Sequence, residues 1–224
     1  MDDSTGDAQY HPGDVAERLF FTRADGTPIN PDTKIAVAAE DQGWVPLEPD
    51  AEALLADESA DPYDRYLAMT ALARWGSPVG YAAVQAAAQD PDEQPWRDYS
   101  IDRFYSLDNT FALLSLAVLD SGDQAVERGS TAERLAALGA LIGISDRVYF
   151  EHNLSDSQMY PEDVAQLRGP IEAQIERGIA ELDAAPADLP LPGWVSDQVE
   201  ELADALSMID KDAADAYKAR LPQA

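Results

Sequence analysis

Apolar and polar positions alternate with helical spacing along much of the chain, most clearly between residues 61 and 90. Asp61-Pro62 combines a capping residue with a proline at the first helical position, and an apolar run then leads to Trp75. Gly76 favours a left-handed stop, and Ser77-Pro78 starts a second helix that ends near Asp90-Pro91. The pattern predicts an antiparallel helix pair joined by a short turn.

The same spacing predicts helices through most of the remaining chain. We expect them over residues 107–119, 131–149, 162–168, 170–182, 195–209 and 212–220. Within 195–209, apolar residues step by four, three, four and three positions and form one stripe: Val195, Val199, Leu202, Leu206 and Ile209. The predicted fold class is mostly α, with antiparallel helix pairs stacked as a short array or an irregular helical bundle.

The first sixty residues are less regular and are interrupted by prolines. Val15, Leu19 and Phe20 indicate a short helix, whereas Phe21–Arg23 and Lys34–Val37 indicate two short strands around a loop. We therefore expect an acidic, loop-rich N-terminal segment over residues 1–60 and a helical domain over residues 61–224, forming one compact unit overall.

The charge of the chain adds a functional clue to the predicted fold. It contains 43 Asp and Glu but only 15 Lys and Arg, which gives a formal net charge of −28 and a pI near 4.1. Solubility of a small domain needs a net charge of only about 2 to 8. The excess is concentrated at the ends: residues 1–61 carry a net −12 and residues 151–224 a net −11. A strongly basic partner, a nucleic-acid-like surface or a salt-rich cytoplasm would each explain such acidity, and the uneven distribution favours a binding surface.

Four acids of the helix expected over 195–209 lie outside its apolar stripe: Asp197, Glu200, Glu201 and Asp204. Like charges at this spacing cost a few tenths of a kcal/mol each in a helix, so a face that carries them suggests a landing surface for a cationic partner. An ordinary solvated face is the alternative. A second group of acids near the N-terminus would also steer a basic partner: Glu48, Asp50, Glu52, Asp57, Glu58 and Asp61.

Aromatic and acidic residues mix between Trp96 and Phe111, where helical spacing is interrupted. Aromatic side chains next to Asp and Arg are typical of interface hot spots, and Trp96, Tyr99 and Tyr105 are the candidate anchors. The alternative is a loop between repeats whose aromatic residues cover the ends of helix pairs.

Patterns that carry known catalytic or metal chemistry are missing from the sequence. The chain has no cysteine and two histidines, His11 and His152, neither in a zinc or di-iron spacing. Gly76–Gly80 places its serine in the wrong position for a nucleophile elbow, and we find no phosphate loop or EF-hand. The sequence predicts a non-enzymatic protein without a cofactor or metal, although composition does not exclude a metal site built from aspartates.

The unit from Asp61 to Pro78 with its partner helix to Gln89 resembles a HEAT-like repeat, in which two antiparallel helices stack on the next pair. A second unit over residues 107–144, with a turn at Asp120–Asp123, is similar more loosely. Together with its acidity, the chain resembles the immunity proteins of bacterial polymorphic toxin systems. That resemblance implies an acidic surface that blocks the active site of a secreted toxin.

The sequence therefore predicts an immunity or inhibitor protein that neutralises a basic toxin, for example a nuclease, by covering its active site. The rivals are a DNA-mimic inhibitor of a nucleic-acid enzyme and a helical scaffold or adaptor from a salt-adapted organism. We expect no direct nucleic-acid binding, because phosphates and acids repel. No secretory signal is evident, and the longest apolar stretch, Phe111 to Leu119, is about half of what a bilayer requires, so we expect a cytoplasmic protein without membrane contact.

Overall fold

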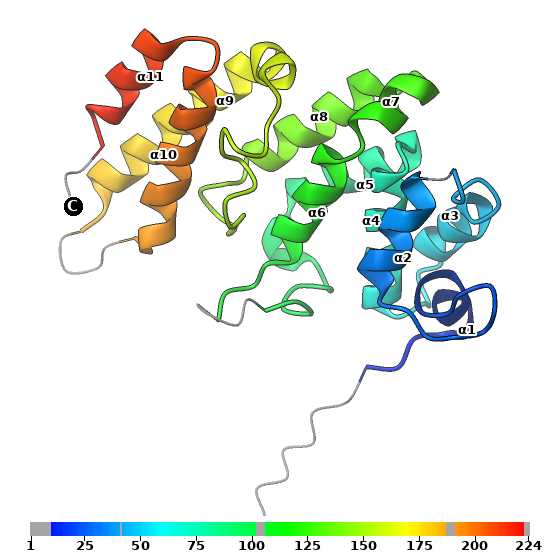
Figure 1. The fold of residues 1–224 in the computed structure, drawn as a ribbon. Helices are drawn as coiled ribbons and strands as arrows, with labels where there is room; N and C mark the ends of the chain where they lie inside the picture. The colour runs from blue at the N-terminus through cyan, green and yellow to red at the C-terminus, as the bar shows by residue number, and fades with distance from the viewer. Residues whose placement is uncertain (1–9, 41, 102–105, 187–190, 222–224) are drawn as a thin grey trace, which may run out of the picture. The chain divides into compact units, whose positions relative to one another are not determined.

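The computed structural model describes residues 10–40, 42–101, 106–186 and 191–221 (Figure 1). Throughout these residues the protein is all-α: eleven α-helices and no strand, in a packed helical arrangement. Internal contacts divide the chain into two compact units, Met1–Ala68 and Met69–Ala224, which we describe separately.

The first unit is helical where short strands were expected. Its elements are α1 (Asp14–Ala16), the π-helical turn Glu17–Phe21, α2 (Pro31–Glu40), α3 (Glu48–Ala56) and the start of α4 (Pro62–Arg74). Lys34–Val37 lies inside α2, because Pro31 starts this helix and the Asn30 side chain accepts a hydrogen bond from the Asp32 amide at 2.9 Å. The strand prediction was wrong; an isolated bridge between Thr22 and Pro28 is what remains near Phe21–Arg23.

The predicted helix pair is confirmed as α4 and α5 (Pro78–Gln89). Gly76 adopts a φ of 77° in the turn, a conformation that favours glycine. Gly80 lies against the end of α4, where a Cβ atom would be 2.4 Å from the Ala73 nitrogen. Glycine is therefore needed both in the turn, at Gly76, and at the start of α5, at Gly80, for the two helices to approach this closely.

Helix α8 (Thr131–Ile142) is the centre of the second unit. It packs against α5, α6 (Thr110–Leu119), α7 (Gly122–Arg128) and α9 (Pro161–Ala184). The C-terminal part continues this packing, with α10 (Gly193–Ser207) between α9 and α11 (Lys211–Lys218) (Figure 1). Fully buried side chains of this unit include Leu72, Leu114 and Leu138.

Three differences from the expected helices of the second unit are large, whereas α6, α10 and α11 begin and end within three residues of their expected bounds. Helix α8 ends at Ile142 and is followed by turns, whereas we expected it to reach Tyr149. The stretch after Asp120 forms α7 where only a turn was expected. The two helices expected on either side of Pro170 are one helix, α9, because Val164, Leu167, Ile171, Ile175 and Ile179 form one continuous buried stripe that holds the helix together across the proline.

Candidate functional site

The four acids of α10 do not form one uniform face. Asp197 and Glu200 are exposed, as expected for a landing surface. Asp204 forms an ion pair with Lys218 of α11. The Glu201 side chain is only 12 % exposed and its Oε1 lies 2.5 Å from Nδ1 of His152. The expectation that all four face solvent was therefore wrong for Glu201, since this carboxyl lies against the loop that follows α8.

Burial dominates the electrostatics of Glu201. It raises the pKa of this carboxyl, and the hydrogen bond to His152 opposes the shift. Its Oε2 atom is buried without a hydrogen-bond partner in the described structure. The contact with His152 gives this carboxyl a partner for proton exchange. The described residues contain no group of three or more side chains that could hold a metal ion.

The acids near the N-terminus belong to the first unit, so we treat them as a separate surface. Asp50 pairs with Arg18 at 2.8 Å. Asp57 accepts hydrogen bonds from the Ser59 amide and hydroxyl, and Asp61 accepts one from the Tyr63 amide at 2.8 Å. The three remaining acids of the group differ in exposure. Glu48 and Glu52 lie in α3 and are half-buried, whereas Glu58 follows α3 and is exposed. About half of this group therefore serves local structure.

The predicted aromatic anchors are placed differently from one another. Trp96 is 5 % exposed and its ring lies 4.9 Å from that of Phe111, so the indole is part of the core. Its prediction as an exposed anchor was wrong, because the loop that precedes α6 folds this side chain inward. Tyr99 is 42 % exposed. Tyr105 lies outside the described residues.

Each lysine and arginine of the described chain donates a hydrogen bond to an oxygen of the protein itself. Most bind carboxylates, and these are Arg18, Arg74, Arg97, Arg134, Arg147, Arg168, Arg177, Lys211, Lys218 and Arg220. The others bind backbone carbonyls, and these are Arg23, Lys34, Arg65 and Arg128. Because acids outnumber bases almost three to one, many carboxylates have no internal cation to neutralise them.

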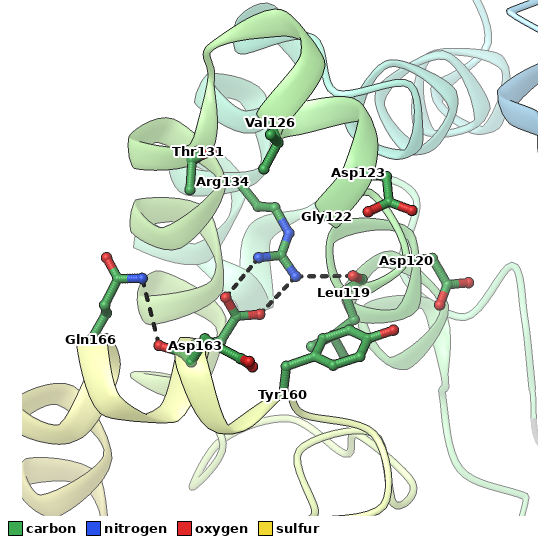
Figure 2. Close-up of a pocket in the computed structure, with 11 residues that line it drawn as sticks. Leu119, Asp120, Gly122, Asp123, Val126, Thr131, Arg134, Tyr160, Asp163 and Gln166 are labelled. Carbon is green, nitrogen blue, oxygen red and sulfur yellow. Dashed lines mark hydrogen bonds and ion pairs between the residues drawn. The ribbon is translucent and has the colours of Figure 1, made fainter.

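A pocket of about 390 Å³ opens where the end of α6, helix α7 and the first turns of α8 and α9 meet. At its base, Arg134 of α8 binds both carboxylate oxygens of Asp163, at 3.0 and 2.8 Å, and the carbonyl of Leu119 at the end of α6 (Figure 2). It also donates a hydrogen bond to the carbonyl of Val118 in α6. Arg134 is 3 % exposed. This bidentate pair, with the additional carbonyl bonds, satisfies a charge that would otherwise be costly to bury.

The rim of this pocket is acidic and partly apolar. It includes Asp120, Asp123 and Glu162, together with the exposed side chains of Val126 and Tyr160. Figure 2 shows Asp120, Asp123 and Tyr160 on one side of the Arg134–Asp163 pair. Asp120 already pairs with Arg74 at 2.5 Å. The pocket thus offers carboxylates and apolar surface to a ligand, while its basic residue is fully engaged.

Sequence reasoning missed this pocket, although one signal was present. Arg134 is spaced by three, four and seven positions from Ala137, Leu138 and Leu141, which are all buried. A charged residue in the apolar stripe of a helix predicts a buried ion pair. Its partner, Asp163, could not be identified from spacing along the chain.

A second pocket lies in the first unit and has a different character. It is lined by Arg23 and Lys34 with the apolar side chains of Ile29, Val37 and Leu47. Lys34 donates hydrogen bonds to the carbonyls of Arg18 and Thr22. This pocket has one acid, Asp25, beside its two bases, whereas acids predominate around the pocket beside Arg134, so it is the weaker candidate for a cationic ligand.

Comparison with known proteins identifies no relative: no protein-family model matches the chain, and searches of curated proteins and of solved structures return no significant match. Among the described residues, no helix combines the length and apolar character needed to cross a bilayer.

Proposed function

We propose that this protein is a non-enzymatic acidic binding protein, an immunity or inhibitor protein that neutralises a basic toxin, for example a nuclease, by covering its active site. The observation that carries this proposal is the engagement of every described lysine and arginine by the protein's own oxygens. The surplus carboxylates are left without internal cations. A basic partner would neutralise them on binding.

The exposed acids would act mainly on the rate of association. Asp197 and Glu200 on α10, and Glu58 in the first unit, are exposed and available for long-range attraction. Electrostatic steering raises association rates by about 10- to 1,000-fold, which suits an inhibitor that must capture a toxin quickly. Carboxylates already bound within the protein, such as Asp50 and Asp204, contribute less.

The helical scaffold supports a finer proposal about the fold. We propose that α4 and α5 form a HEAT-like repeat and that the pairs after it stack as a short array. The glycine-dependent turn at Gly76 and Gly80 and the packing of α5 on α8 support this arrangement. The insertion of α7 between α6 and α8 is the main departure from a regular repeat.

The neighbouring gene provides the first test of the proposed function. We expect it to encode a large secreted protein with a basic C-terminal domain, and co-expression of this protein should protect cells from that domain. Binding should weaken by at least ~10-fold between ~50 and ~500 mM salt, because added ions screen steering charges. Toxicity that persists on co-expression, or binding that does not change with salt, would contradict the proposal.

Charge reversal locates the surface. The double variant Asp197→Lys with Glu200→Lys should weaken binding of the toxin domain by ~10-fold, because two attractions become repulsions. The matched control reverses two exposed acids from the nearly balanced middle of the chain, Glu93→Lys with Glu133→Lys, and should change binding little. Equal losses in both variants would mean that net charge matters and the α10 surface does not.

The two rival functions predict other results. A DNA mimic would bind a nucleic-acid enzyme in competition with its DNA, and it would not protect against the neighbouring toxin. A scaffold from a salt-adapted cell would lose its fold in dilute buffer, because its acids would need salt to screen their repulsion.

A further inference from the structure

The two most exposed of the large apolar side chains in the described structure line the same pocket. Val126 is 71 % and Tyr160 58 % exposed, whereas the other exposed large apolar residues lie between 39 and 53 %. Both belong to the pocket beside the Arg134–Asp163 pair (Figure 2). Exposed aromatic rings at the edge of a concave site are typical of the anchors that bind a partner side chain.

Two carboxylates of this pocket remain available to a ligand. Asp123 on α7 and Glu162 in the first turn of α9 are exposed, and neither pairs with a lysine or arginine of the described chain. The other two acids are already occupied, since Asp120 binds Arg74 and Asp163 binds Arg134. The pocket therefore presents two free negative charges beside an aromatic ring.

Arg134 would not compete with a cationic ligand for the carboxylates of Asp123 and Glu162. Its guanidinium binds Asp163 at two points and the carbonyls of Val118 and Leu119 at 2.9 Å each. This pair closes the base of the pocket and joins α8 to the start of α9. The ligand site is therefore limited to the rim, where the charge is negative.

We propose that this pocket binds one arginine side chain of a basic protein partner. The flat guanidinium would stack on the Tyr160 ring and pair with Asp123 and Glu162, while its methylene groups would contact Val126. A lysine ammonium fits less well, because it is strongly hydrated and cannot stack as a plane. The partner's identity rests on the function proposed above, but the chemistry of the pocket does not.

A short peptide tests the pocket without the partner. Acetyl-Gly-Arg-Gly-amide is titrated into the full chain, with amide shifts followed by NMR, beside peptides that carry citrulline or lysine at the centre. We expect saturable shifts at the amides of Val126 and Gln166, and binding at least ~3-fold tighter for arginine than for its neutral isostere citrulline. Equal binding of citrulline, or shifts scattered over the acidic surface, would overturn the proposal.

Matched variants separate the pocket from general acidity. Tyr160→Ala should weaken the arginine peptide ~3-fold or more, whereas Tyr99→Ala, which removes an exposed ring outside the pocket, should not. Asp123→Asn should weaken it, and Asp197→Asn should not. All four side chains are exposed, so none of these substitutions should disturb the fold. A preserved NMR spectrum will verify this for each variant. Loss of binding in both members of a pair would overturn the proposal.

The toxin domain then distinguishes failure of this proposal from failure of the proposed function. If the domain binds and Tyr160→Ala leaves its affinity unchanged, the pocket proposal is wrong and the proposed function stands. If the arginine peptide binds the pocket while the toxin domain does not bind the protein, the pocket proposal is supported and the proposed function is wrong.

Discussion

At the scale of single residues, similar side chains have different roles because their surroundings differ. Glu200 and Glu201 are neighbours in α10, but one is exposed and the other lies against His152. Asp163 and Glu162 are neighbours in α9, but Asp163 binds a buried arginine while Glu162 faces the pocket rim. An acidic residue of this chain can therefore be assigned a role only from its contacts.

The buried pair at the base of the pocket makes a strong prediction. Asp163→Asn should lower the free energy of unfolding by about 3 kcal/mol, because it leaves the Arg134 charge buried without its counter-ion. Urea unfolding followed by circular dichroism measures the change. Glu162→Gln, at the exposed neighbouring position, should cost less than about 1 kcal/mol. Equal effects of the two substitutions would show that the ion pair does not stabilise this unit.

Glu201 makes a prediction about pH. Burial raises its pKa in the folded protein above the ordinary value of 4.5, so its ionisation opposes folding at neutral pH. Glu201→Gln should therefore stabilise the protein at pH 7, and this gain should disappear as the pH falls through the folded pKa towards 4.5. Thermal unfolding between pH 4 and 7 tests the trend. Glu200→Gln is the exposed control; a pH-independent effect of Glu201→Gln would contradict the assignment.

At the scale of elements, buried stripes decide where helices continue and end. Helix α9 runs through Pro170 although a proline in a helix interior removes a backbone hydrogen bond and crowds the preceding turn. Its buried residues on both sides of the proline offset this cost. Helix α8 ends earlier than its apolar content suggested, and the chain then folds as turns around Val148 and Phe150, which are buried.

The proline in α9 gives a prediction at this scale. Pro170→Ala should raise the free energy of unfolding by about 1 kcal/mol. This is less than the ~3 kcal/mol difference in intrinsic helix propensity, because the substitution also removes the proline ring that lies near Gly139 of α8. Urea unfolding is the measurement. Pro161→Ala is the matched control at the start of the same helix, where no intrahelical bond is lost, and it should change little. A loss of stability in Pro170→Ala would mean that the proline is required for packing.

At the scale of the whole molecule, charge and packing are largely separate. The second unit is built on the apolar contacts of α8, α9 and α10, and the bases are used within the protein. The acidic surplus lies outside these contacts. It therefore adds repulsion that packing must overcome, which is the reason to look for a partner that benefits from it.

Salt provides the prediction for the whole molecule. We expect the helical circular dichroism signal to persist at ~20 mM salt, and the thermal midpoint to rise as salt is added, because screening reduces repulsion among the acids. A protein that is unfolded at ~20 mM and folds only near ~1 M salt would support the salt-adapted scaffold instead. Repeating the scan with sucrose, which does not screen charge, separates charge screening from general stabilisation.

The sequence by itself determined the helical class, the α4–α5 pair with its turn at Gly76, and the stripe of α10, because spacing, caps and glycines act over a few residues. It also established the acidic surplus. Only the tertiary structure decided that Lys34–Val37 is helical, that Trp96 is buried, and that Arg134 meets Asp163. These outcomes depend on contacts between segments far apart in the chain, so local periodicity carries no information about them.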